Sequence, residues 1–158
     1  MFRTVRPTVL VALLALAACG GSDPTGTTVP SIETTTFAPS LGVDLSKMTK
    51  NSSGLYWRDL TVGSGTTAVN GKQVAMHYTG NLPNGTQFDA NGPTATPFSF
   101  RLGAGQVIAG FDEGVRGMNV GGRRQLIIPP ELGYGSRATG SIPANSILVF
   151  TIDLVSVQ

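Results

Sequence analysis

Short segments rich in apolar, aromatic and β-branched residues, bounded by turns, mark strands in the last two thirds of the chain. Aromatic and β-branched residues fill Leu55–Val62, which stops at a Gly-Ser-Gly turn, and the same composition returns at Gln73–Thr79 after an Asn-Gly dipeptide. Four more segments of this kind follow: Thr86–Asp89, Pro97–Leu102, Arg123–Ile128 and Ser146–Val157. Short strands separated by turns that contain Gly and Pro predict a mostly antiparallel sheet.

One stretch has the period of a helix instead. Its apolar residues recur at steps of one, three, four and three positions, as on one face of an amphipathic helix: Val107, Ile108, Phe111, Val115 and Met118. The predicted fold class is therefore α+β, with an antiparallel β-sheet wrapped around one short amphipathic helix. The turns fall where loops at one end of such a sheet would surround a cleft.

The chain begins with the pattern of an export signal, residues 1–18. Two arginines precede an uncharged apolar run, Val9–Ala18, which is too short to span a bilayer as a helix. The segment Leu16–Cys19, with the sequence Leu-Ala-Ala-Cys, resembles the bacterial lipoprotein signal motif. The resemblance implies that a peptidase cuts before a lipidated Cys19. An ordinary signal peptide followed by a chance cysteine is the alternative.

Gly, Ser, Thr and Pro dominate residues 19–50, where neither helical nor strand periodicity is visible. A segment of this composition buries too little apolar surface to offset the entropy of ordering it. We therefore predict a flexible tether, dispensable for folding, between the lipidated cysteine and the folded part. The remaining residues, 51–158, are enough for one modest hydrophobic core and predict a single domain.

The charge pattern excludes a nucleic-acid partner. Charged residues make up 13% of the 158 residues, about half of the usual quarter. The net charge of +2 comes from Arg3 and Arg6 of the export signal, and the rest of the chain carries equal numbers of cations and anions. Arg123 and Arg124 are adjacent but belong to no wider basic patch, so we expect them on the solvent face at the end of a strand.

Cysteine and histidine occur once each, which is too few for a disulfide framework or for a zinc site with the usual ligands. We expect no metal and no cofactor. His77 lies inside a predicted strand with no Ser or Cys nucleophile pattern near it, and this favours a structural role over general-base catalysis.

Seven separated motifs follow one another in the predicted domain. They are His77–Gly80, Gly85–Asp89, Pro97–Gly103, Val107–Val115, Met118–Gly122, Ile127–Gly135, and Ile142–Asn145 with Leu148–Phe150. Together they strongly resemble the FKBP-type peptidyl-prolyl cis-trans isomerases, in that family's order, through nearly all of residues 54–158. The resemblance implies the FKBP-like fold and the activity of that family.

The resemblance also implies an apolar substrate pocket. Its walls are aromatic and aliphatic side chains: Tyr78, Phe88, Phe98, Val107, Ile108, Tyr134, Ile142 and Phe150. Phe111 takes the position of the pocket floor, where the family most often has Trp. Periodicity alone assigns Val107, Ile108 and Phe111 to the core, and this alternative stays open.

Three polar groups take roles by the same resemblance. The Tyr134 hydroxyl and the backbone N–H of Ile142 would hold the carbonyls of the substrate. Asp89 is the carboxylate of the pocket, and it either orients the Tyr78 hydroxyl or faces the rotating carbonyl. Its alternative role is to cap a loop beside Asn91.

The implied reaction is isomerisation of an X-Pro amide, because a dry aromatic cavity favours the less polar, twisted amide without any covalent bond to the protein. The expected partners are unfolded or proline-containing exported polypeptides and macrolide inhibitors of the tacrolimus type. The expected form is a monomer, lipid-anchored on the extracytoplasmic side of the cell membrane. Two other functions are weighed against this one: a binding module that holds proline-containing segments without turnover, and a structural envelope lipoprotein.

Overall fold

The computed structural model describes residues 29–158. The predicted export signal, the lipidation site at Cys19 and the first part of the predicted tether lie outside the described residues. Within residues 29–158, no helix is long and apolar enough to cross a bilayer.

One antiparallel sheet forms the body of the domain, and it contains seven strands within residues 29–158. The strands are β1 (Thr49–Lys50), β2 (Tyr56–Thr61), β3 (Gln73–Asn81), β4 (Gln87–Asn91), β5 (Phe98–Arg101), β6 (Arg123–Ile128) and β7 (Leu148–Val157). Their order is β1-β2-β6-β7-β3-β4, and β5 pairs with the first part of β3, on the edge where β4 pairs with the last part. This arrangement confirms the predicted fold class, and the six predicted strands are found with their ends shifted by at most two residues.

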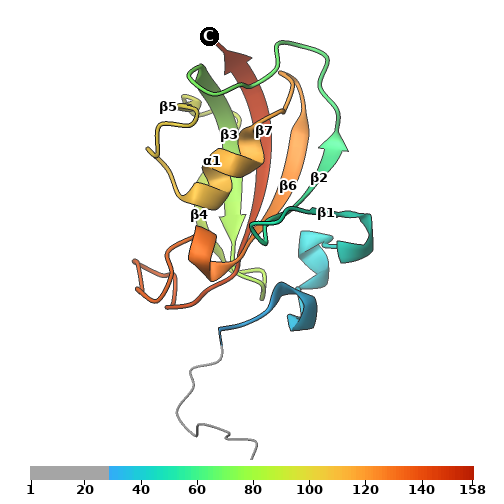
Figure 1. Cartoon of the computed structure of the whole chain (residues 1–158), viewed down its shortest axis with the longest axis vertical. Coiled ribbons are helices and arrows are strands. Elements are labelled where there is room, and N and C mark those ends of the chain that lie inside the picture. The colour runs from blue at the N-terminus through green and yellow to red at the C-terminus, as the bar shows by residue number, and fades with distance from the viewer. Residues whose placement is uncertain (1–28) are drawn as a thin grey trace, which may run out of the picture.

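The helix α1 (Ala109–Val115) lies against one face of the sheet (Figure 1). Gly110 and Gly114 face Ile128 and Leu126 of β6 so closely that a methyl group on either glycine would overlap the aliphatic side chain. These glycines therefore set the short distance between α1 and the sheet. The helix is shorter than the apolar stripe predicts, because Ile108 before it is extended and Gly117 after it has a φ of 78°.

Residues 29–48 form an N-terminal strap, which is drawn blue to cyan in Figure 1. It contains three short 3-10 helices: η1 (Ile32–Thr34), η2 (Pro39–Leu41) and η3 (Leu45–Lys47). Ile32 is only 3% exposed and packs with Tyr56, Ile127 and Val149. Leu126, Ile128 and Phe150 alternate with these sheet residues and belong to the core under α1, so the strap covers the opposite face of the sheet.

The prediction of a flexible tether is therefore wrong for residues 29–50. The apolar residues of this segment are irregularly spaced, so no period reveals them, but they pack together: Ile32, Phe37, Leu41, Val43, Leu45 and Met48. Side chains of the sheet also bind the strap's backbone, since Gln125 Nε2 donates to Leu41 O at 2.8 Å and Arg58 Nη2 donates to Gly42 O. Two polar sheet residues thus bind the backbone of a segment whose only helices are single 3-10 turns.

A charged cluster joins the strap to the sheet at Glu33. Its carboxylate accepts hydrogen bonds from Lys50, Ser31 and the Tyr56 hydroxyl, the last at 2.6 Å. These hydrogen bonds, that from Lys50 first, hold the pKa of Glu33 well below its usual range. Glu33 is therefore ionised at every pH at which the domain is expected to work.

Arg124 corrects the prediction for the arginine pair. It is 5% exposed and donates to Asp59 in a bidentate pair, with N to O distances of 2.6 and 3.0 Å. Its Nη1 also donates to Gly114 O and Arg116 O, and its guanidinium stacks on the Trp57 ring at 4.2 Å. Arg124 therefore ties β6 to β2 and to the end of α1, whereas Arg123 is exposed as predicted.

Candidate functional site

An aromatic cleft of about 510 Å³ opens on the side of α1 that faces β3, β4 and β5. Its lining residues are Tyr78, Asp89, Phe98, Gln106, Val107, Ile108, Phe111, Tyr134 and Phe150. Seven of the predicted wall and floor residues are therefore brought together here, along with the predicted carboxylate. They come from four strands, from α1 and the loop before it, and from the loop after the 3-10 helix η4 (Pro130–Leu132).

The rings of the aromatic cleft pack edge to face. Phe111 lies 5.1 Å from Phe150 and 5.8 Å from Tyr78, measured between ring centroids, with interplanar angles of 80° in both pairs. Phe98 stands against the other side of Tyr78 at 5.8 Å. Such pairs hold one another's orientation, so the cleft has a preformed apolar bottom.

Phe111 is at once a core residue and the floor of the cleft. It is 4% exposed, it belongs to the main core cluster, and it also lines the cleft. The two alternatives that periodicity left open for Phe111 are therefore compatible, because the same residue packs in the core and lines the cleft.

The Tyr78 hydroxyl donates to Asp89 Oδ2 at 2.7 Å. Burial, and then the hydrogen bond and charge of Asp89, raise the pKa of Tyr78 to about 12. Asp89 is part of β4, opposite Gly80, and is not a loop cap. Of the roles considered for Asp89, this hydrogen bond supports the orientation of the Tyr78 hydroxyl.

Phe88 and Ile142 differ from the prediction, because neither lines the aromatic cleft. Phe88 packs behind Phe150 at 5.5 Å, in space that the absent side chain of Gly80 leaves open. Ile142 is 6% exposed and belongs to the core. Phe88 therefore supports Phe150 of the cleft wall, whereas Ile142 is part of the core.

The backbone N–H of Ile142 is already used, since it donates to Thr139 O at 2.9 Å. The predicted role of this N–H as a donor to the substrate is therefore not available in this conformation. The N–H of Ile108 is different: it precedes α1, its residue lines the aromatic cleft, and it has no acceptor within residues 29–158. The sequence analysis did not identify the N–H of Ile108, because whether a backbone N–H has a hydrogen-bond acceptor depends on the loop conformation and not on the residue type.

Two further positions complete the cleft. The Tyr134 hydroxyl has no hydrogen-bond partner within the described residues, and Tyr134 is 37% exposed. The hydroxyl is therefore available to donate to a ligand in the cleft. Gln106 was not predicted, and no pattern in the sequence distinguishes it. Its Oε1 accepts from the backbone N–H of Arg101 at 2.7 Å, which fixes the loop that carries Val107 and Ile108.

Residues 29–158 contain no group of three or more His, Cys, Asp or Glu side chains that could hold a metal ion. His77 instead makes a hydrogen bond between its Nδ1 and Asn91 Oδ1 at 2.8 Å. Asn91 Nδ2 in turn donates to Thr96 O, so this pair holds the β4–β5 connection.

The fold and the cleft define a class: a small α+β domain whose sheet wraps around one helix and carries a preformed aromatic pocket for an apolar group. The family model for FKBP-type peptidyl-prolyl cis-trans isomerases matches residues 64–155. The chain belongs to this family.

Known relatives are similar over the domain. An FK506-binding protein of Neisseria meningitidis serogroup B is 48% identical over 105 residues, which are 66% of this chain and 96% of the relative. FK506-binding protein 3 of Candida albicans is 53% identical over 105 residues, again 66% of this chain but only 24% of the relative. The chain thus spans about a quarter of the length of this fungal relative and nearly the whole of the bacterial one.

Solved structures show the same fold. The crystal structure of FkpA from Escherichia coli has a TM-score of 0.65 and 37% identity, over 71% of this chain and 52% of that one. The crystal structure of AtFKBP13 has a TM-score of 0.64 and 40% identity, over 69% of this chain and 97% of that one. The fold is therefore FKBP-like.

Proposed function

We propose that this protein catalyses cis-trans isomerisation of X-Pro bonds in polypeptides. The observation that carries the proposal is the aromatic cleft itself, in which five aromatic rings line a space of about 510 Å³ and one of them, Tyr78, is hydrogen-bonded to Asp89. A proline ring is a compact apolar group, and a cleft of this size and lining suits it. Membership of the isomerase family supports the same reaction.

The reaction needs no nucleophile. Rotation of an X-Pro bond crosses a barrier of about 18 to 20 kcal/mol, because amide resonance is lost at the twisted geometry. Water stabilises the polar planar amide, so replacing water by the rings of Phe98, Phe111 and Phe150 favours the twisted form. An acceleration of four to six decades requires only about 5.5 to 8 kcal/mol. Desolvation and two or three hydrogen bonds are of this order.

Two donors are free to hold the carbonyl groups on either side of the bond. They are the Tyr134 hydroxyl and the N–H of Ile108, both of which belong to cleft residues without a protein acceptor in residues 29–158. The Tyr78 hydroxyl is already directed to Asp89, and this hydrogen bond keeps the Tyr78 ring and its oxygen in place. In this scheme Tyr78 and Asp89 shape the cleft in which the carbonyl rotates.

The test is catalysis of a proline-limited reaction. We expect the full chain to accelerate isomerisation of a short X-Pro peptide, and expect Phe98→Ala and Asp89→Ala to lower kcat/KM by at least about tenfold, which is about 1.4 kcal/mol. Val155→Thr, on the outer face of β7 away from the cleft, is the matched control. Activity that is the same in Asp89→Ala, Phe98→Ala and the control would rule out catalysis in this cleft.

A second candidate function uses the same cleft for binding without turnover, as a chaperone or assembly factor does. The observation that favours it is Phe111, where the family most often has the larger Trp. The two functions separate if Asp89→Ala abolishes catalysis of a proline-limited refolding step. If that variant still binds unfolded chains and protects them from aggregation, binding does not depend on the catalytic groups of the cleft.

We further propose that the cleft binds macrolides of the tacrolimus type. Several relatives are named as FK506-binding proteins, and the apolar floor and walls of the cleft are built from the residues that the family resemblance assigns to the pocket. Competition between the macrolide and a proline peptide in the isomerisation assay tests this. A macrolide that binds without inhibiting would place its site elsewhere.

The location that we propose is the extracytoplasmic side of the cell membrane, with a lipid anchor on Cys19 and unfolded or proline-containing exported polypeptides as clients. The support is the sequence of residues 1–19: two arginines, an apolar run and the Leu-Ala-Ala-Cys segment. We also propose that the protein acts as a monomer and that it has no nucleic-acid partner.

A further inference from the structure

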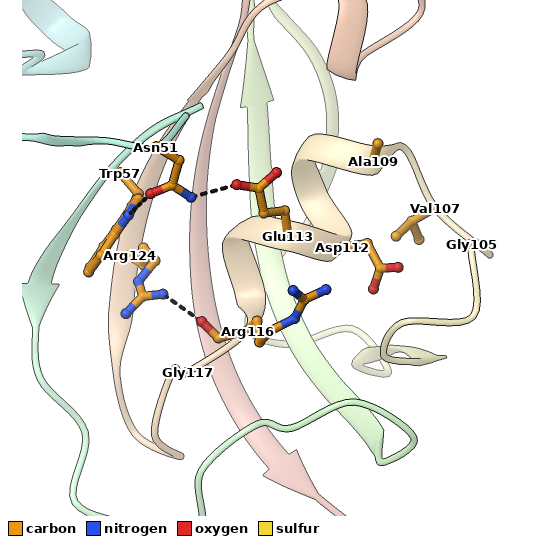
Figure 2. Close-up of a pocket in the computed structure, with 10 residues that line it drawn as sticks. All are labelled: Asn51, Trp57, Gly105, Val107, Ala109, Asp112, Glu113, Arg116, Gly117 and Arg124. Carbon is orange, nitrogen blue, oxygen red and sulfur yellow. Dashed lines mark hydrogen bonds between the residues drawn. The ribbon is translucent and has the colours of Figure 1, made fainter. Parts of the chain in front are cut away.

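A second cleft, which we call the polar cleft, runs along α1 on the side of the helix that faces β2 and β6, and has a volume of about 720 Å³. Figure 2 shows its lining, which includes Asn51, Trp57, Ala109, Asp112, Glu113 and Arg116. None of the catalytic groups proposed above belongs to it.

The polar cleft borders the aromatic cleft. Val107 lines both, while its neighbours alternate: Gln106 and Ile108 line the aromatic cleft, and Gly105 and Ala109 line the polar one. The segment 105–109 is therefore a ridge between two adjoining spaces. The two clefts also flank the first turn of α1, which with its side chains is about 10 Å wide, and an extended chain advances about 3.3 Å per residue. A polypeptide bound by its proline in the aromatic cleft thus needs about three residues to cross the ridge.

One wall of the polar cleft is fixed by hydrogen bonds. Asn51 lies between Trp57 and Glu113 (Figure 2), accepting from Trp57 Nε1 at 3.0 Å and donating to Glu113 Oε1. Ser53 Oγ adds a second donor to the same carboxylate oxygen at 2.8 Å. Such a wall exists before any ligand arrives, so binding does not have to order it.

The polar cleft has a net negative charge. Arg124 lines it as well, but its charge is balanced by Asp59. Asp112 and Glu113 are engaged only by neutral donors, among them the backbone N–H of Gly103 at 2.7 Å. Within residues 29–158, neither carboxylate and no atom of Arg116 is part of an ion pair. Two carboxylates against one guanidinium leave an excess of one negative charge.

We propose that the polar cleft is a subsite for the polypeptide segment that flanks the proline, and that it prefers a Lys or Arg side chain about three to five residues from the proline. The inference rests on the proposed isomerase function. Its supports are the shared border at Val107, the preformed wall and the charge of the lining. The polar cleft thus gives the isomerase a preference among proline-containing clients.

The test compares three peptides with the same X-Pro centre. The first is a tetrapeptide, the second is extended on both sides with Lys about four residues from the proline, and the third has Glu in place of each Lys. We expect kcat/KM to be highest for the Lys peptide and to exceed that of the Glu peptide by about two- to fivefold at low salt, the size of a solvent-exposed ion pair. The difference should shrink at high salt.

Two variants locate the effect. Ala109→Trp fills the polar cleft from an exposed position that does not line the aromatic cleft, and Ala104→Trp places the same bulk in the same loop outside both clefts. We expect the ratio of kcat/KM for the Lys peptide to that for the tetrapeptide to fall to about one in Ala109→Trp and to persist in Ala104→Trp. The isosteric double variant Asp112→Asn, Glu113→Gln keeps the hydrogen-bond acceptors and should remove the preference for Lys over Glu, whether or not Ala109→Trp folds.

The outcomes separate the subsite from the isomerase function. Without acceleration of the tetrapeptide, the proposed function fails. A tetrapeptide that is turned over as well as the Lys peptide overturns the subsite and leaves the isomerase function intact. The subsite is equally overturned by a Glu peptide that equals or exceeds the Lys peptide, or by a Lys preference that survives in the double variant.

Discussion

Phe111 shows how one residue can serve the core and the site together. Its ring is 4% exposed and lies within about 6 Å of three other rings, yet the same ring closes the bottom of the aromatic cleft. A substitution here therefore changes stability and binding at once. The two effects can be separated, because enlarging the ring and removing it act in opposite directions on the depth of the cleft.

We predict that Phe111→Trp is tolerated and tightens binding of a tacrolimus-type macrolide by up to about 1 kcal/mol, from added apolar contact at about 25 cal/mol per Å². Phe111→Ala should cost about 3 to 5 kcal/mol of stability, as a buried ring is lost. Melting temperatures and macrolide affinities of both variants measure this. A Trp variant that loses about 1 to 3 kcal/mol of stability by overpacking and gains no affinity would contradict the role of Phe111 as the cleft floor.

Tyr78 gives a prediction about pH. Its pKa is raised from 10 to about 12, first by burial and then by Asp89. The protonated hydroxyl is favoured in the folded state, so its contribution to stability is complete below pH 10 and is lost as the pH rises through about 12. We predict that Tyr78 stays protonated at pH 10, as measured by phenolate absorbance against a Tyr78→Phe variant.

The matched variant Asp89→Asn tests the order of the two causes. Because burial is the larger cause, the pKa of Tyr78 should fall in Asp89→Asn but remain above 10. A pKa of 10 or lower would mean that Asp89 alone holds the hydroxyl protonated.

At this scale the family motifs predicted side chains better than backbone groups. Tyr78, Phe98 and Phe150 lie where the resemblance placed them, because a motif fixes residue types at fixed positions. The donor role assigned to the N–H of Ile142 was wrong, because that N–H turns back to Thr139. This hydrogen bond joins backbone groups three residues apart and requires no particular side chain, so no residue type in the sequence predicts it.

The N-terminal strap is the element that the sequence did not reveal. The strands were predicted from segments rich in aromatic and β-branched residues, and the helix from its period near 3.6. Ile32, Phe37 and Leu41 have no constant spacing, so their joint burial depends on the sheet face that they cover. That face is itself visible only after Tyr56, Ile127 and Val149 have been brought side by side by strand pairing.

We predict that the strap contributes to folding stability. Ile32→Ala should lower the free energy of unfolding by about 2 kcal/mol, the lower end for a buried Ile, since Ile32 is 3% exposed. Val29→Ala, at a strap residue that is 48% exposed, is the control and should change little. Urea unfolding measures both.

Truncation tests the strap as a whole. A protein that begins at residue 49 should be less stable than one that begins at residue 29. Equal unfolding midpoints for the two proteins would mean that the strap is dispensable for folding.

The buried ion pair between β2 and β6 gives a prediction with a neighbouring control. Asp59→Ala leaves the buried charge of Arg124 without its partner, and the expected loss is about 3 kcal/mol, the lower end for breaking such a pair, since the Asp59 side chain is 27% exposed. Arg123 lies 3.7 Å from Asp153 with both side chains about half exposed, so Arg123→Ala should cost less than about 1 kcal/mol. Equal losses on chemical unfolding would mean that burial of Arg124 does not matter.

At the scale of the whole molecule, the fold class was predictable and the strand order was not. Most strands are local runs of aromatic and β-branched residues between turns, so their existence can be predicted from the local sequence. The pairing of β3 with β7 joins segments far apart in the chain, and no local pattern in the sequence predicts it. The aromatic cleft depends on that pairing, because Tyr78 of β3 and Phe150 of β7 meet there with Phe111 of α1.

The last prediction concerns where the whole protein resides. If Cys19 carries several acyl chains, each buried methylene contributes about 0.8 kcal/mol, and attachment to the membrane is effectively permanent. We expect the protein in the membrane fraction, released by detergent but not by high salt, because the charge of the chain beyond the export signal is balanced and offers no electrostatic attachment. Cys19→Ser should leave the protein soluble or unprocessed while its isomerase activity on a tetrapeptide is kept. An unmodified mature N-terminus at another residue, found by mass spectrometry, would contradict the anchor without touching the proposed reaction.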